Sequence, residues 1–177
     1  MLEPPAMNGS PQTEQDFAKS GNARAKIAAV WLYLVVATTV LNSLMLFKFS
    51  HFVNLLIGLS ITQFIDAAFV GMQLEPPGAP WWYTAAPALV LDAPFVILVL
   101  VLAMKVSNQR RRATGFAFWI YAIDTFLVAL SFTASIAILH SPIWPLAWQD
   151  SGLVARGIGL WILFRAWRRL VKTEISA

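Results

Sequence analysis

The sequence predicts an all-α integral membrane protein, a helical bundle with about five transmembrane helices, and three observations support this fold class. The 177 residues are 58% hydrophobic and only 12% charged, whereas soluble domains average roughly 45–50% and 25%. The hydrophobic residues gather into long runs, and the Lys and Arg residues cluster beside those runs. A soluble protein of this length could not bury so much apolar surface, but a lipid bilayer solvates it.

Five apolar runs define the predicted spans, and each is close to the roughly 20 residues needed to cross a hydrocarbon core of about 30 Å. Helices are expected because backbone polar groups in lipid must be satisfied within the segment. The link over residues 73–84 contains Pro76, Pro77 and Pro80 and cannot continue a helix. The fifth run is the weakest, because it contains Asp150 and Arg156. The runs fall near 27–47, 52–72, 85–104, 115–139 and 146–164, within a transmembrane domain of residues 26–170.

The segments outside this domain are polar. Residues 1–25 contain prolines and have no apolar periodicity, which predicts a flexible polar tail, and residues 171–177 are expected to form a short cytoplasmic tail. With five spans, nine of the thirteen Lys and Arg residues fall on the C-terminal side, whereas Lys19, Arg24 and Lys26 fall on the other side. The positive-inside rule then predicts an N-terminus outside and a C-terminus in the cytoplasm.

A four-span arrangement is the alternative, with the last segment lying flat at the membrane interface. It would put one of the basic clusters on the unfavourable side of the membrane, so it ranks second.

Four charged residues fall inside the predicted spans, where charges are rare and usually face the interior of a bundle. At about 1.5 Å per residue, Asp66 and Asp92 are expected at one depth, in the outer third of the membrane. By the same measure Asp124 and Arg156 are expected near the midplane, where they would form an ion pair. Asp66 and Asp92 would be two carboxylates in a low dielectric, so we expect one or both to carry a proton at pH 7.

Two further polar residues belong to this candidate intramembrane site. Gln63 stands three residues before Asp66, and Tyr121 stands three before Asp124, so each shares a helix face with its acid. A structural interpretation remains open for the whole set. An Asp–Arg pair can fix helix packing, and Asp92 can extend toward the outer interface instead of meeting Asp66.

Several function classes lack the residues they require. There is no cysteine, and His51 and His140 fall on opposite sides of the membrane, so the sequence predicts no metal site. No zinc-protease, phosphate-loop or dinucleotide motif is present, and no histidine lies at the depth of the helix Ser and Thr residues. We therefore expect no catalytic residues, no cofactor and no enzymatic activity. The basic clusters are explained by topology and lipid contact, without nucleic acid.

The pattern resembles a family of small bacterial multi-pass inner-membrane proteins of uncharacterised function. The residues that carry the resemblance are Leu41–Ser43, Gly58–Leu59, Ile61–Gln63 with Asp66, Leu91–Asp92 with Ile97–Leu102, and Tyr121–Ala122 with Asp124. Members of this group tend to carry a His near the position of Arg156, where this chain departs from them. The resemblance implies a membrane fold and a location in the bacterial inner membrane, and it implies no activity.

Two functions fit these expectations. The first is a non-enzymatic structural or accessory membrane component, such as a subunit of a membrane complex, in which the charged pair holds helices together. The alternative is a small proton- or cation-coupled carrier that uses Asp66 and Asp92 with Asp124. Because about five helices are few for a transporter, the carrier would act as a homo-oligomer. The lipid bilayer is the partner in either case.

Overall fold

A computed structural model describes residues 11–49, 58–71, 80–139 and 143–175 of the chain. These residues form an all-α structure, as the sequence predicts. Four of its helices are long and one is short, and each predicted apolar run contributes to one of them. The helices are α1 (Pro11–Phe49), α2 (Ser60–Gly71), α3 (Trp82–Ser107), α4 (Arg111–Leu139) and α5 (Ile143–Ile175).

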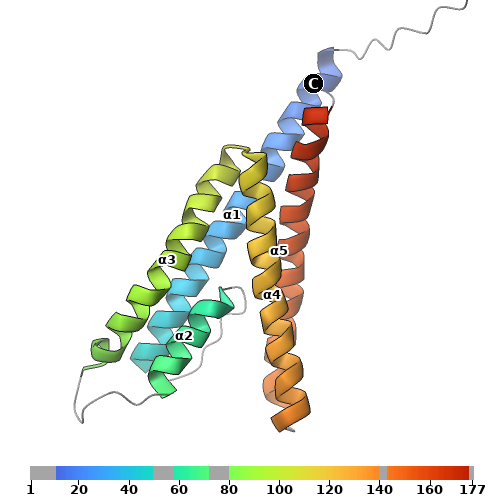
Figure 1. The fold of residues 1–177 in the computed structure, drawn as a ribbon. Helices are drawn as coiled ribbons and strands as arrows, with labels where there is room; N and C mark the ends of the chain where they lie inside the picture. Colours follow the sequence, from blue (N-terminus) through green and yellow to red (C-terminus); the bar gives the residue numbers. More distant parts are fainter. Residues whose placement is uncertain (1–10, 50–57, 72–79, 140–142, 176–177) are drawn as a thin grey trace, which may run out of the picture.

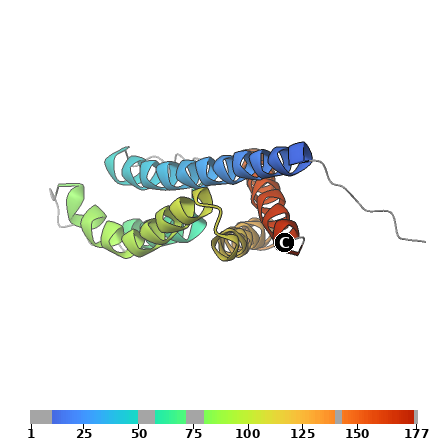
Figure 2. The same ribbon diagram turned by 90° about the horizontal axis from the view of Figure 1, so that it is seen from above.

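The long helices form two pairs, and the short helix lies between them. Figure 1 shows α1 beside α3 and α4 beside α5, with α2 in the lower half of the bundle. Seen from above, α1 and α3 are inclined to the pair formed by α4 and α5 (Figure 2). α2 contacts α1, α3 and α4, so it fills the space where the two pairs diverge.

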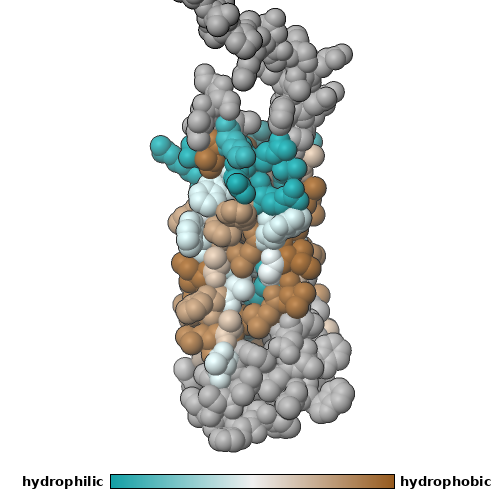
Figure 3. Space-filling view, turned by 90° about the vertical axis from the view of Figure 1, so that its right-hand side faces the viewer, coloured by the Kyte–Doolittle hydropathy of each residue, from teal (hydrophilic) through white to brown (hydrophobic). Residues whose placement is uncertain are grey.

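Three segments of the described chain are long and apolar enough to cross a membrane: Gly21–Lys48, Trp82–Ser107 and Arg111–Leu130. Only 28–33% of the residues in their most apolar windows are buried within the protein. The remaining apolar side chains face outward and form a hydrophobic belt below a hydrophilic end (Figure 3). Such a belt is stable when lipid covers it, so the chain is a membrane protein by its surface as well as its composition.

The second predicted span is corrected by the structure. A helix was expected over 52–72, but α2 has only 12 residues and begins at Ser60. At 1.5 Å per residue it is about 18 Å long, too short for a hydrocarbon core of about 30 Å. Gly58 and Leu59 are described and are not helical, whereas residues 52–57 lie outside the described residues. The described part of the second run is thus too short to span, and neither α2 nor α5 is among the three segments that are long and apolar enough to cross a membrane.

The direction of α1 is the second correction. Arg24 of α1 and Arg165 and Arg169 of α5 lie near one another, so the first part of α1 is at the same end of the bundle as the last part of α5. Helices α1 and α2 both run away from that end (Figure 1). The described ends thus lie at one end of the bundle, whereas the sequence predicts them on opposite sides of the membrane.

Residues 11–25 also differ from the predicted flexible tail, because they are helical and continuous with the first span. Pro11 occupies the first turn, where its missing N–H costs no helical hydrogen bond. Residues 1–10 of the predicted tail lie outside the described residues.

A tight link joins α3 to α4 at the hydrophilic end. Its N–H groups at Asn108, Gln109 and Arg110 donate to carbonyl oxygens in the last turn of α3. Gln109 has a φ of 58°, a left-handed conformation that commonly ends a helix. The link holds α3 and α4 antiparallel and keeps their basic residues at one end.

The core that joins the pairs is built from small and medium side chains. Ala28 and Ala29 of α1, Ala103 of α3 and Ala117 of α4 are buried in one cluster with Leu163 of α5. Small residues let helix backbones approach closely, which is how helices associate in lipid, where apolar burial gives little drive. This close packing brings polar groups of different helices into contact.

Candidate functional site

The predicted ion pair between Asp124 and Arg156 is present. The guanidinium of Arg156 on α5 contacts the carboxylate Oδ2 of Asp124 on α4, and both side chains are buried. Each residue lies 13 positions from the start of its helix, which puts the pair about 20 Å along α4 and α5, near the middle of the bundle. This depth agrees with the sequence prediction.

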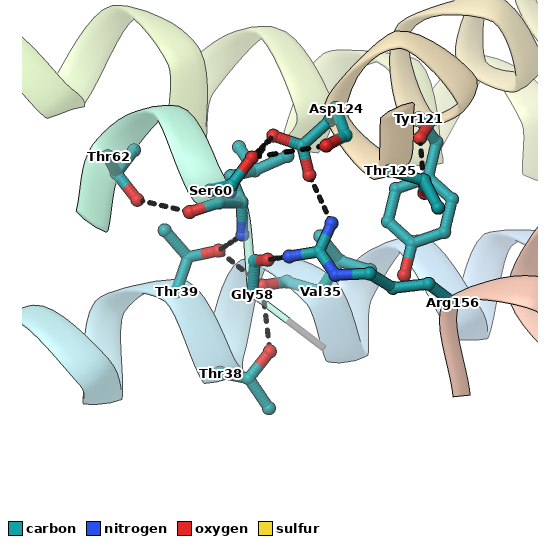
Figure 4. A network of polar contacts seen from close by, with 11 residues as sticks. Val35, Thr38, Thr39, Gly58, Ser60, Thr62, Tyr121, Asp124, Thr125 and Arg156 are labelled. Carbon is teal, nitrogen blue, oxygen red and sulfur yellow. Dashed lines mark hydrogen bonds and ion pairs between the residues drawn. The ribbon is translucent and has the colours of Figure 1, made fainter. Parts of the chain in front are cut away.

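The pair binds the chain segment that precedes α2 (Figure 4). Arg156 Nη2 donates to the carbonyl oxygen of Gly58. Asp124 Oδ1 accepts from the backbone N–H of Ser60 at 2.9 Å and from the Ser60 hydroxyl. A carboxylate that accepts from the first N–H groups of a helix acts as an N-terminal cap, although this one comes from a different helix.

Helix α1 contributes the third anchor of this segment. The hydroxyl of Thr39 accepts from the N–H of Leu59 at 2.8 Å and donates to the carbonyl of Val35 at 2.7 Å. Groups from α1, α4 and α5 therefore bind the backbone of three consecutive residues, Gly58 to Ser60. We call Thr39, Asp124 and Arg156 the clamp. Backbone without helical hydrogen bonds is tolerated at membrane depth when protein groups satisfy it in this way.

Gly58 is required by the closeness of α1. A methyl group at this position would lie 3.0 Å from Asn42 Nδ2 and 3.1 Å from the backbone N and Cα of Thr39. Hydropathy alone predicts that residues 58–60 are the interior of a span, so it does not identify Thr39, Gly58 and Ser60 as parts of the site. A local signal was present, because Ser60-Ile-Thr-Gln63 matches the Ser-x-x-Gln capping box that begins helices.

Tyr121 lies one turn before Asp124 on α4 and packs against the clamp. Its ring centroid is 5.8 Å from the guanidinium carbon of Arg156, within the range of a cation–π contact. Its hydroxyl and the indole N–H of Trp31 are buried near each other, and neither forms a well-aligned hydrogen bond with a described residue. Trp31 in turn lies on Gly159, where a methyl group would overlap the indole. Tyr121 thus joins the clamp to the packing of α1 against α5.

Asp66 and Asp92 form a second polar cluster, separate from the clamp. Asp66 lies on α2 and Asp92 on α3, their carboxyl groups are close together, and Ser43 of α1 lies within reach of both. The two residues are 1% and 3% exposed. Oδ1 of Asp66 and both carboxylate oxygens of Asp92 form no well-aligned hydrogen bond with the described residues. The predicted proximity of these acids is confirmed, and we call Ser43, Asp66 and Asp92 the acidic cluster.

Gln63 lies half-buried in the first turn of α2, between the two clusters. Its side chain has a polar interaction of its own. It stands three residues after Ser60 and three residues before Asp66 on this short helix.

The two clusters differ in what they can do chemically. Every side-chain group of the clamp already binds another group of the fold, as the contacts of Thr39, Asp124 and Arg156 show. The acidic cluster has spare oxygen atoms that can accept or hold a proton. Among the described residues, no three His, Cys, Asp or Glu side chains come together as a metal site. Comparisons of the chain with protein-family models, with curated proteins and with solved structures find no match.

Proposed function

We propose that this chain is a small membrane carrier that binds and transfers a proton at Asp66 and Asp92. The observation that supports the proposal most directly is the burial of both acids with three carboxylate oxygens left without well-aligned hydrogen bonds. Two carboxylates side by side in a low dielectric cannot both be charged without a large cost, so a shared proton is the natural occupant. Burial of two such carboxyl groups lowers the stability of the fold, and this kind of cost is common at functional sites.

The short helix α2 supports a carrier over a purely structural role for the acidic cluster. Discontinuous helices that begin near the midplane line the binding sites of many secondary transporters. Here α2 begins beside the clamp and carries Asp66 six residues later, about 9 Å along its axis. The clamp binds the start of α2, and Asp66 of α2 lies beside Asp92 of α3. A small shift of α2 would therefore change the environment of the proton.

A proton fits the cluster better than a divalent cation. Ca²⁺ needs six to eight oxygen ligands, and Mg²⁺ needs near-ideal octahedral geometry. Asp66, Asp92 and Ser43 provide few ligands of that kind. Because a single chain offers few helices for a pathway, the proposed carrier acts as a homo-oligomer.

The proposed topology has four spanning helices and α2 as a half-helix that enters the membrane without crossing it. Eleven of the thirteen Lys and Arg residues lie toward the end of the bundle that holds Arg24 and Arg165. The positive-inside rule assigns this end to the cytoplasm, with both described ends of the chain on that side. The bacterial inner membrane remains the proposed location, from the resemblance alone.

The test is proton uptake in liposomes that contain the purified protein, followed with a pH-sensitive dye under an imposed potential. Asp66→Asn and Asp92→Asn should each abolish uptake. Thr133→Val is the matched control, because the Thr133 side chain is exposed and its hydroxyl donates to the carbonyl of Ala129 in its own helix. An infrared band for a protonated carboxyl group, lost in both Asn variants, should accompany the activity. Uptake that survives both Asn variants would sink the proposal.

The second candidate is the structural or accessory component, and the complete use of the clamp's polar groups favours it. Native mass spectrometry after gentle detergent extraction separates the two candidates. A stoichiometric partner protein would support the accessory role, and a homo-oligomer would support the carrier.

A further inference from the structure

A pocket of about 350 Å³ lies between α1 and α5 at the hydrophilic end of the bundle. Trp161 and Phe164 of α5 form its apolar part. Its other lining residues are all cationic, and no acidic residue of the described chain lines it. They are Arg24 of α1 with Arg165, Arg168, Arg169 and Lys172 of α5.

The charges in this pocket oppose one another. Arg24 of α1 and Arg165 of α5 line the same pocket, so positive charges from two helices lie close together there. Cations at close range repel one another, and a bound anion between them lowers that electrostatic energy. An arginine guanidinium can donate two parallel hydrogen bonds to two oxygen atoms of a phosphate group. Phosphate is therefore the anion that suits this set of side chains best.

An apolar stripe leads from the pocket along α5. Val154, Ile158 and Trp161 are 66%, 52% and 57% exposed, and their spacing of four and three residues puts them on one helix face. Arg165 continues the same face, and its guanidinium carbon lies 4.5 Å from the ring centroid of Trp161. The stripe therefore ends at a cation that is fixed over an aromatic ring at the mouth of the pocket.

The cationic pocket and the apolar stripe together match the headgroup and the acyl chain of a lipid. Figure 3 shows hydrophilic residues above a hydrophobic belt on the side of the molecule where α5 lies. A free phosphate would use the charges but not the stripe. We propose that the pocket binds the phosphate headgroup of an anionic phospholipid, with an acyl chain along Val154, Ile158 and Trp161. Tryptophan and arginine at this depth are the side chains that hold such a headgroup at the interface.

The proposal is tested by native mass spectrometry of the full chain in detergent, titrated with long-chain phosphatidylglycerol. Phosphatidylcholine with the same chains tests the need for net negative charge, and glycerol phosphate tests the need for the chains. The wild-type protein should retain phosphatidylglycerol in preference to both. Arg165→Gln and Arg168→Gln remove exposed cations of the pocket, and each should weaken binding about fivefold.

The matched control is Arg112→Gln, which removes an exposed cation from the same end of the bundle but outside the pocket. Its affinity for phosphatidylglycerol should equal that of the wild type. An equal loss in all three variants would mean diffuse attraction of lipid to a basic surface and would overturn the site. Full competition by glycerol phosphate would overturn the lipid assignment in favour of a free anion. Thermal unfolding of each variant checks that the fold is unchanged.

Discussion

The backbone N–H of Ser60 donates to Oδ1 of Asp124 at 2.9 Å, so a carboxylate on α4 caps a helix that lies 64 residues earlier in the chain. The other oxygen of this carboxylate binds Arg156. The ion pair thus stabilises the beginning of α2 as well as the contact between α4 and α5. The ion pair therefore satisfies the polar groups of non-helical backbone inside a membrane bundle.

We expect Asp124→Ala to destabilise the protein by about 3–5 kcal/mol, because it leaves Arg156 charged, buried and without its partner. The N–H of Ser60 loses its cap in the same change. Thermal unfolding in detergent measures the loss.

The double variant Asp124→Leu with Arg156→Met is the informative comparison for this pair. Apolar residues of similar volume avoid the lone buried charge, so the double variant should be more stable than Asp124→Ala alone. A double variant that is less stable would contradict this account of the clamp, since it would mean that charge pairing itself supplies most of the stability.

Gly58→Ala should also destabilise the protein, since the added methyl group meets the backbone of Thr39 at 3.1 Å and the backbone of α1 cannot move aside cheaply. Gly157→Ala is the matched control on α5, where a methyl group meets nothing within 4 Å. The control should be about 0.5–1 kcal/mol more stable than the wild type, because alanine is the better helix former. Equal effects of the two substitutions in a thermal unfolding experiment would argue against the close contact of Gly58 with α1.

The proposed topology is open to a direct labelling experiment, because the chain contains no cysteine. Single cysteines in place of Gly21, Asn108 and Lys172 should react with an impermeant maleimide from one side of the membrane. A cysteine in place of Pro80, which is exposed two residues before the start of α3 and so at the far end of α3 from Asn108, should react from the other side. Labelling of Gly21→Cys together with Pro80→Cys would restore the five-span arrangement.

The sequence predicted much of the fold because hydropathy and helix rise are local quantities. Spans near 27–47, 85–104, 115–139 and 146–164 lie inside α1, α3, α4 and α5. The depth of each charge, counted at 1.5 Å per residue, predicted that Asp124 meets Arg156 and that Asp66 meets Asp92. These pairings follow because a lone charge in lipid has few other ways to be satisfied.

The break before α2 could not be predicted in the same way, because distant residues determine it. Residues 58–60 are bound by Thr39, Asp124 and Arg156, which are 20 to 98 positions away in the chain. Hydropathy records only that the segment is apolar, so the run looked like a complete span. The predicted orientation of α1 depended on counting this run as a complete crossing, since each crossing reverses the side assigned to everything before it.

The last prediction concerns the stability of the acidic cluster. Both carboxylate oxygens of Asp92 are buried without well-aligned hydrogen bonds among the described residues, and such groups cost about 1–3 kcal/mol each. Asp92→Leu removes both of these oxygens and leaves Asp66 and Ser43 of the acidic cluster in place. The variant should therefore unfold a few degrees higher than the wild type, while proton uptake is lost. Gain of stability with loss of activity is the signature of a residue kept for function. If Asp92→Leu instead lowers the unfolding temperature, Asp92 holds α3 against α2 as a structural residue, and the carboxylates are part of the packing of the bundle.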